Sequence, residues 1–205
     1  MPRIAADRPA AEPQSPGQRA RHERILDAAA RLGAEHGLDH VQMHDVAKEA
    51  GVAIATLYRY FPSKTHLFTA IMAGQVERMG ESSPEIDAAA DPVEAVAETL
   101  LRSTRHMLRT PRLASAMMQS TYAAHVATVS EAAATEAKVH DTVLGLLGLV
   151  EPTDQDNRLV RLLMKSWHGV LISAIYAHST LSEAETEVRL ACEVLLAARS
   201  NAPGR

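Results

Sequence analysis

Apolar residues recur every three or four positions along most of the chain, which is the pattern of amphipathic helices. The first example is formed by Ile25, Leu26, Ala29 and Leu32. Together with the residues that mark helix ends, the pattern predicts nine helices. They cover residues 18–36, 43–50, 54–60, 63–79, 92–109, 111–126, 130–150, 154–179 and 182–199. No segment alternates apolar and polar residues as a half-buried strand does, so an all-α fold is expected.

Two capping boxes support these boundaries. Asp91 predicts the cap of the fifth helix, with Pro92 in its first turn and Glu94 as the carboxylate that closes the box. Ser182 with Glu185 predicts the same arrangement at the start of the ninth helix.

The two shortest predicted helices, 43–50 and 54–60, are joined by a turn at Gly51 and followed by a stop at Pro62. Two short helices at a fixed angle are the arrangement by which proteins place one helix in the major groove of DNA. Leu57 takes the inward position of the second helix. The polar cluster expected on its other side is Thr56, Tyr58, Arg59 and Tyr60, followed by Lys64.

The composition fits a helical protein with a substantial core. Of the 205 residues 46% are hydrophobic and only 3% aromatic, which favours helices over strands. No run of 18 apolar residues is present, so no membrane span is expected. The first 17 residues are rich in proline and lack the apolar segment of a signal peptide, and we expect a disordered tail. Cys192 is the only cysteine, which excludes an internal disulfide and fits a cytoplasmic protein.

The net charge of −4 is unevenly distributed. Residues 1–80 hold 10 Lys and Arg against 9 Asp and Glu, whereas residues 81–205 hold 11 against 16. A small basic face in the first part can therefore bind DNA although the remainder is acidic.

The segment GVAIATLYRYFPSKTHLF at 51–68 resembles the signature of TetR-family transcriptional repressors. That signature reads Gly-Val-Ser-x-x-Thr-Leu-Tyr-x-(Tyr/His)-Phe-x-(Ser/Asn)-Lys-x-x-Leu, and the similarity extends from Arg24 to about Met72. Within the family, VQMHDVA at 41–47, the Arg-x-Pro segment at 109–111 and Glu-Pro-Thr at 151–153 are similar to KstR-type repressors of sterol and lipid catabolism.

The resemblance implies a nine-helix architecture with three parts: the tail (1–17), a three-helix helix-turn-helix domain (18–62), and a larger effector-binding and dimerisation domain (63–205). It implies a homodimer that leaves its double-stranded operator when a hydrophobic effector binds, such as a sterol- or fatty-acid-derived CoA thioester. Arg105 or Arg109 would then meet the CoA phosphates. No cofactor is implied. A repressor of drug efflux or another pathway, and an activator, remain alternatives.

A helical enzyme is a more distant alternative. The chain has no nucleophile elbow, phosphate loop or metal-binding helix motif.

DNA binding requires neutralisation of phosphates and contacts to base edges. The hydroxyls of Thr56 and Tyr58 are expected to bind phosphates, and Lys64 is expected to meet one beside a helix N-terminus. Arg59 either reads a guanine or holds a phosphate. Tyr60 either shares this surface or packs against the first helix.

Ile54 stands where the sequence departs from the family pattern. The capping Ser of the signature is Ala53 here, and Ala55 replaces a frequent Gly. Our hypothesis is that Ile54 contacts a thymine methyl group. The alternative is that Ile54 packs against the first helix.

Further cations and polar groups lie near this segment. The start of the first helix carries three cations, Arg19, Arg21 and Arg24, although the helix dipole disfavours positive charge there. We expect them to contact phosphate or the minor groove. The alternative is that they are solvated charges. Gln42 and His44 are expected to touch the DNA backbone, although His44 is equally well a surface histidine.

A metal is not expected at His36, His40 and His44. Gly37 ends the first helix and interrupts the continuous helix that their spacing requires.

The effector pocket is predicted where Met residues occur together with polar-tipped aromatic side chains in the middle helices. The alternative for each Met is core filling. The expected lining residues are Leu100, Thr104, Leu108, Met118, Thr121, Tyr122, His125, Trp167 and Leu171.

The last two predicted helices carry apolar stripes that exceed what one subunit needs to cover itself. Stripes from two chains would form a four-helix bundle, whereas the alternative is packing within one chain. The expected interface residues are Leu159, Leu163, Val170, Ala174, Val188, Cys192 and Leu195. Cys192 is expected to act as a small buried apolar group.

Overall fold

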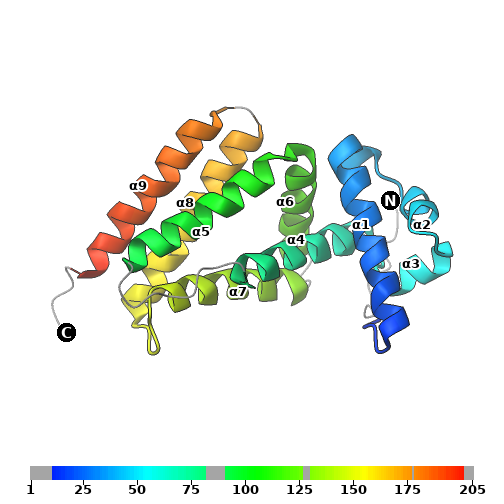
Figure 1. Ribbon diagram of the computed structural model, residues 1–205, viewed down its shortest axis with the longest axis horizontal. Coiled ribbons are helices and arrows are strands. Elements are labelled where there is room, and N and C mark those ends of the chain that lie inside the picture. Colours follow the sequence, from blue (N-terminus) through cyan, green and yellow to red (C-terminus); the bar gives the residue numbers. More distant parts are fainter. Residues whose placement is uncertain (1–10, 82–90, 127–129, 177, 201–205) are drawn as a thin grey trace. The chain divides into compact units, whose positions relative to one another are not determined.

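The computed structural model describes residues 11–81, 91–126, 130–176 and 178–200. Within those ranges the chain forms nine helices and no strand, which confirms the all-α prediction (Figure 1). The helices are α1 (Pro16–His40), α2 (Met43–Glu49), α3 (Ile54–Tyr60), α4 (Lys64–Glu81), α5 (Pro92–Leu108), α6 (Pro111–Val126), α7 (Ser130–Leu146), α8 (Asp154–Ile175) and α9 (Leu181–Ser200). None of these described helices combines the length and apolarity that a membrane span requires.

The chain forms two compact units and passes from one to the other three times. The first unit holds Met1–Gly74 and Arg112–Ala133, and the second holds Gln75–Pro111 and Ala134–Arg205. The first unit therefore contains α1, α2, α3, most of α6 and the beginning of α4. This division by packing differs from the expected division by function after Pro62, because α6 packs with the helices at the start of the chain.

The first helix starts earlier than predicted. The Ser15 side chain accepts a hydrogen bond from the backbone N–H of Gln18 and caps α1, so residues 16 and 17 are helical. The backbone N–H of Ala11 donates to the carbonyl of Arg59 at 3.0 Å. Residues 11–17 are thus ordered rather than part of a disordered tail, and the prediction for residues 1–10 lies outside the described residues. Gly37, with φ of 73°, breaks the helical geometry as expected, but the chain resumes helix up to His40.

The predicted caps of α5 and α9 need correction. Asp91 does cap α5 by accepting from Val93, but Glu94 binds Arg189 instead of closing the box. At α9 the capping box is formed by Thr180 and Glu183, which bond reciprocally at 2.7 and 3.2 Å. The sequence contains two overlapping boxes that start two residues apart, Thr-Leu-Ser-Glu and Ser-Glu-Ala-Glu, and the local pattern does not distinguish them.

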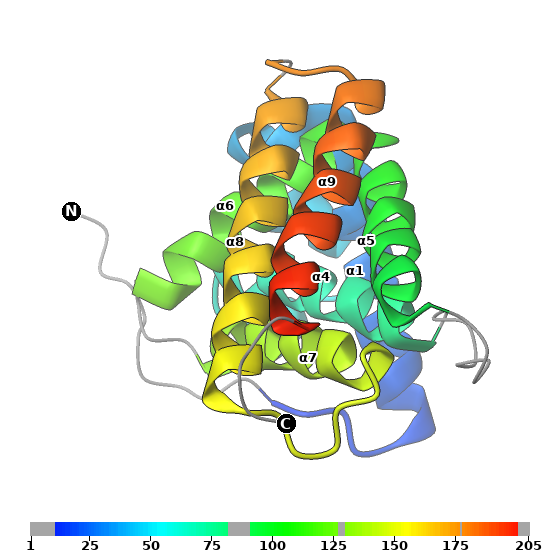
Figure 2. The ribbon, with the colours of Figure 1, turned by 90° about the vertical axis from the view of Figure 1, so that its left-hand side faces the viewer.

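The second unit is built around α5, α7, α8 and α9. In Figure 2, α8 and α9 run side by side on the face of this unit that is toward the viewer. The sides of α8 and α9 that are turned toward α5 and α7 are buried in one apolar core. The central residues are Val96, Leu100, Leu101, Val143, Leu147, Val160, Leu163, Val188, Cys192 and Leu196.

In the first unit, α1 makes a close approach to α4 and α6 at Gly33. A Cβ placed on Gly33 would lie 2.7 Å from Cε1 of Phe68 and 3.1 Å from Cδ1 of Leu113. Nearby, the guanidinium of Arg112 donates to the backbone carbonyl of Glu35. Gly33 therefore allows three helices to meet where any side chain would keep them apart.

We expect Gly33→Ala to destabilise the protein by about 1–3 kcal/mol, because the added methyl group overpacks a site filled by the buried Phe68 ring. Thermal unfolding would show a lower Tm. Gly17→Ala is the matched control, since a Cβ at Gly17 meets no atom within 4 Å. Equal Tm values for the two variants would contradict the close approach.

Candidate nucleic-acid interface

A tight backbone turn fixes the angle between α2 and α3. The N–H groups of Ala50 and Val52 donate to the carbonyls of Val46 and Ala47, at 2.9 and 3.0 Å, and Gly51 adopts a φ of 64°. The buried side chains of α2 hold this turn from the inside. The turn at Gly51 is confirmed, and it positions α3 as the second helix of a helix-turn-helix.

α3 has an inner and an outer side. Leu57 and Tyr60 are buried, whereas the outer residues form two rows in which each pair is separated by one helical turn. One row is Ile54 and Tyr58, which are 38% and 48% exposed. The other row is Ala55 and Arg59, which are also exposed. The boundaries of this helix agree with the prediction, and Ile54 is exposed to solvent.

Tyr60 is buried and packs against the first helix, which is the second of the two alternatives expected from the sequence. Its ring meets the His22 ring edge-on, with centroids 5.6 Å apart, and His22 also lies 4.8 Å from the Phe61 ring. Sequence reasoning missed His22. The signal was present, because His22 precedes Ile25 by three residues and continues the apolar stripe of α1.

Arg59 is exposed but held. Its guanidinium carbon lies 5.1 Å from the centroid of the Tyr60 ring, and Nη2 donates to the Tyr60 hydroxyl at 3.4 Å. The cation–π geometry and this hydrogen bond both favour one position for the side chain.

Lys64 binds the protein rather than standing free. Its Nζ donates to the backbone carbonyl of Leu38 at 3.0 Å and the side chain is half-buried. An ammonium group has three N–H donors, so this bond occupies one of them. A phosphate contact by Lys64 stays a prediction.

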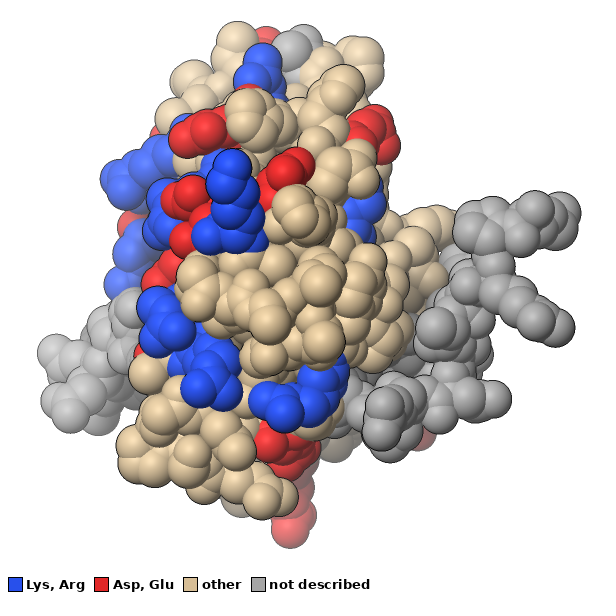
Figure 3. All heavy atoms as spheres, turned by 90° about the vertical axis from the view of Figure 1, so that its right-hand side faces the viewer, with Lys and Arg blue, Asp and Glu red and all other residues tan. Residues whose placement is uncertain are grey.

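The other expected contact residues surround α3 in different ways. Arg19 is exposed, Arg21 is half-buried, and the Nε of Arg24 donates to the carbonyl of Ala50 at 3.4 Å. Gln42 is the exposed N-cap residue of α2, and its side chain makes no capping bond. His44 is exposed and lies 3.9 Å from Asp45. Figure 3 views the right-hand side of Figure 1, where α2 and α3 are drawn, and shows Lys and Arg side chains around an uncharged area, with Asp and Glu side chains among them.

The expected pocket residues fall in both units. In the second unit Leu100, Thr104 and Leu171 are buried, while Leu108 and Trp167 are half-buried. The indole N–H of Trp167 donates to the Thr104 hydroxyl at 2.9 Å, and this hydroxyl donates to the Leu100 carbonyl. A polar pair therefore links α8 to α5 among apolar side chains.

The remaining pocket residues lie on α6. Met118 is buried and Thr121 half-buried, with a buried hydroxyl for which the described residues show no hydrogen-bond partner. Tyr122 and His125 are exposed, Tyr122 by 70%, because the buried side of α6 carries other residues such as Met117. The structure thus does not enclose Tyr122, and its part in an effector pocket stays a prediction.

Three of the residues expected in the dimer interface are covered within the chain instead, and the interface itself stays a prediction. Leu163, Val188 and Cys192 are fully buried within the chain, where they pack in the core of the second unit. Leu159, Val170, Ala174 and Leu195 are half-buried. The large apolar residues of these helices that are exposed are instead Leu162, Leu181, Leu190 and Val194. Cys192 is fully buried, which confirms that it is a buried small group, and this burial raises the pKa of its thiol to about 12.

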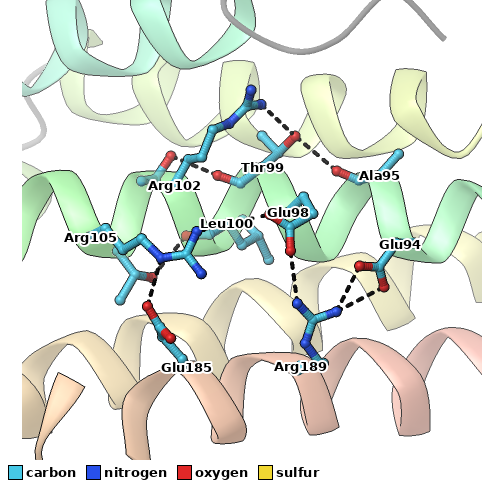
Figure 4. A network of polar contacts seen from close by, with 11 residues as sticks. Glu94, Ala95, Glu98, Thr99, Leu100, Arg102, Arg105, Glu185 and Arg189 are labelled. Carbon is cyan, nitrogen blue, oxygen red and sulfur yellow. Dashed lines mark hydrogen bonds and ion pairs between the residues drawn. The ribbon is translucent and has the colours of Figure 1, made fainter. Parts of the chain in front are cut away.

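An ion-pair cluster that the sequence did not reveal joins α5 to α9 (Figure 4). Arg189 donates to Glu94 at 2.7 and 2.9 Å and to Glu98 at 2.8 Å. Arg105 donates to Glu185 at 2.6 Å. Because Arg105 is committed to a carboxylate, the suggestion that it meets the phosphates of a CoA effector is not supported.

The exposed face of α3, fixed by the turn at Gly51 and by buried inner residues, defines a helix-turn-helix DNA-binding protein. The model of the bacterial regulatory proteins of the TetR family matches residues 25–71, and the tetracycline repressor-like C-terminal domain matches residues 90–195. The chain belongs to the TetR family of transcriptional regulators.

Several relatives share most of their length with this chain. The transcriptional repressor KstR of Rhodococcus jostii (strain RHA1) is 31% identical over 92% of this chain and 89% of its own. The crystal structure of a TetR regulator from Rhodococcus sp. RHA1 has 47% identity and a TM-score of 0.81, over 88% of this chain and 97% of that one. Thermus thermophilus FadR in complex with lauroyl-CoA has a TM-score of 0.66 and 20% identity, over 90% and 100% of the two chains, and shows the shared fold alone.

We expect the packing under α3 to weaken in acid. Burial lowers the pKa of His22 below 6.5, and the nearby Glu23 opposes this shift. The unfolded chain therefore binds more protons than the folded one, and the stability contributed by neutral His22 is lost as the pH falls below about 6.5.

The measurement is Tm between about pH 7 and pH 5 for the wild type and His22→Phe, which keeps an aromatic ring but cannot titrate. The wild type should lose more Tm on acidification than the variant. His168, whose pKa burial also lowers, is present in both proteins and cancels in the comparison. Parallel curves would contradict the role of His22.

Proposed function

We propose that this protein is a repressor that binds double-stranded operator DNA in the cytoplasm through the outer side of α3 and releases it on binding a hydrophobic small molecule. The observation that carries the proposal is the division of α3, in which Leu57 and Tyr60 are buried and Ile54, Ala55, Tyr58 and Arg59 are exposed. A helix with this division can enter the major groove without disturbing its own support.

The polar groups around α3 supply the contacts that position such a helix. The hydroxyls of Tyr58 and Thr56 bind phosphates from within the helix, and Arg19, Arg21 and Arg24 approach the backbone or the minor groove from the start of α1. Gln42 and His44 do so from the start of α2. Lys64 meets a phosphate with the donors that Leu38 does not occupy.

Ile54 supplies an apolar contact to a base. Its side chain is exposed at the first residue of α3, where it is 38% accessible. An apolar group in this place gains by contacting the methyl group of thymine, which marks that base in the major groove.

The effector is a lipid-derived molecule, such as a sterol or a fatty acyl CoA thioester. This part of the proposal is supported by the similarity to KstR and by the apolar side chains that surround the Thr104–Trp167 hydrogen bond in the second unit. A drug or another small molecule remains the alternative, and ligand titration distinguishes them.

Two copies form the working protein. Leu162, Leu190 and Val194 are 48%, 56% and 60% exposed on α8 and α9, although the opposite sides of these helices are buried within the chain. A second copy packed on this face would cover these residues in a four-helix arrangement.

The function is tested by selecting a binding site from random duplex DNA and then titrating the complex with lauroyl-CoA, cholesterol and free coenzyme A. We expect one enriched sequence. Either lauroyl-CoA or cholesterol should stabilise the protein by about 2.7 kcal/mol at a concentration of 100 times Kd, which raises its Tm. The same ligand should release the DNA. Free coenzyme A controls for the nucleotide moiety. No response to any of the ligands would remove the lipid class, and no enriched sequence would remove DNA recognition.

The dimer is tested with Leu190→Arg combined with Val194→Arg. Two charges on the exposed side of α9 should leave the chain fold intact, because neither residue contributes to the buried core, but should prevent pairing of two copies. Sedimentation should show a dimer for the wild type and a monomer for the variant. Val150→Arg, at a residue 94% exposed after α7, is the control and should stay dimeric. A monomeric wild type would refute the interface.

A further inference from the structure

Recognition of a particular DNA sequence requires a side chain that distinguishes one base pair from another. In the described helix α3, Ile54, Ala55 and Leu57 have no polar side-chain atom, and Thr56 and Tyr58 each have a single hydroxyl. The second tyrosine of the helix is buried. Arg59 is therefore the one residue of α3 whose side chain has several N–H donors in a fixed plane.

We propose that Arg59 reads a guanine in the operator, and that Tyr60 and the backbone N–H of Ala11 are the groups that position it. The inference rests on the proposed DNA-binding function and assigns its base specificity. An arginine matches guanine because its two parallel N–H groups reach O6 and N7 at the major-groove edge.

The surroundings of Arg59 favour a base over a phosphate. Arg59 shares the outer side of α3 with Ile54, for which a base contact is proposed above, and this side is directed into the groove when Leu57 faces inward. Ala55 precedes Arg59 by one turn on the same side, and its methyl group is too short to screen the guanidinium from a base edge. The cations that the proposed function assigns to phosphates or the minor groove lie outside α3, on α1 and α4, and are Arg19, Arg21, Arg24 and Lys64.

Two contacts hold Arg59 before DNA arrives. The guanidinium stacks at 5.1 Å over the Tyr60 ring and donates to the Tyr60 hydroxyl at 3.4 Å. The backbone carbonyl of Arg59 accepts from the N–H of Ala11 at 3.0 Å. This carbonyl lies in the last turn of a helix, where carbonyls lack a partner within the helix.

This preorganisation matters because arginine has many rotamers, and ordering them opposes binding. Tyr60 is itself fixed by the His22 ring, so the position of the guanidinium is set by the interior of the unit. The segment from Ala11 to the α1 cap at Ser15 fixes the backbone end of the same residue.

The test is a series of single base-pair substitutions across the site that wild-type protein enriches, measured with wild type, Arg59→Lys, Arg59→Gln and Ile54→Ala. Wild type should prefer one G·C pair by about 5- to 150-fold over its substitutions. Arg59→Gln should lose this preference. Arg59→Lys keeps the charge but not the planar pair of N–H groups, so it should weaken the preference. Both variants should keep the preferences at other positions. Ile54→Ala is the matched outer-side control and should keep the guanine preference while losing one at a thymine.

Tyr60→Phe tests the positioning. The variant keeps the ring over which Arg59 stacks but removes the hydroxyl, so its Tm should stay close to that of the wild type. Its guanine preference should fall by about 2- to 12-fold. An unchanged preference would overturn the positioning role of Tyr60.

The outcomes separate this inference from the function on which it depends. If Arg59→Gln weakens binding to all sites equally and lowers the salt dependence by about one ion, while Arg59→Lys changes neither a base preference nor the salt dependence, Arg59 holds a phosphate and the inference is overturned while DNA binding stands. A site without a guanine also overturns it. Arg31→Gln, which removes a cation paired with Glu49 on α1 and α2, controls for the loss of one charge and should change no base preference. A wild type that enriches no sequence refutes the proposed function as well.

Discussion

The burial of the inner side of α3 is the constraint on which the rest of the first unit depends. A helix of seven residues is too short to persist in water by its own hydrogen bonds, so α3 exists because Leu57 and Tyr60 are packed against neighbouring helices. The turn at Gly51 and the ring of His22 complete this support. Because the inner side is fixed, the side chains of the outer side are held in one orientation, as recognition of a base edge requires.

The second unit is built from longer helices whose apolar residues lie on more than one side. Its long helices α8 and α9 bury one apolar stripe within the chain and leave a second apolar set exposed. The Arg189 cluster with Glu94 and Glu98 fixes α9 to α5 at the edge of that core, where the charges are partly exposed and favour a defined alignment more than they add stability.

The sequence predicted those elements whose ends are marked by unique local signals. Gly51 and Pro62 bracket α3, and its bounds are as expected, whereas two overlapping capping boxes near Thr180 made the start of α9 ambiguous. Periodicity identified the stripe containing Leu163 and Val188 as buried, but periodicity does not say whether the same chain or another copy covers it. Contacts between distant segments, such as Ala11 with Arg59 and His22 with Tyr60, have no local signal and required the structure.

The central claim is that the outer side of α3 lies in the major groove. Methylation interference on the selected operator tests it directly, because methyl groups on guanine N7 project into the major groove and those on adenine N3 into the minor groove. The account predicts that N7 methylation at the guanine of each half-site abolishes binding. Interference confined to adenine N3, with binding unaffected by N7 methylation, would contradict it.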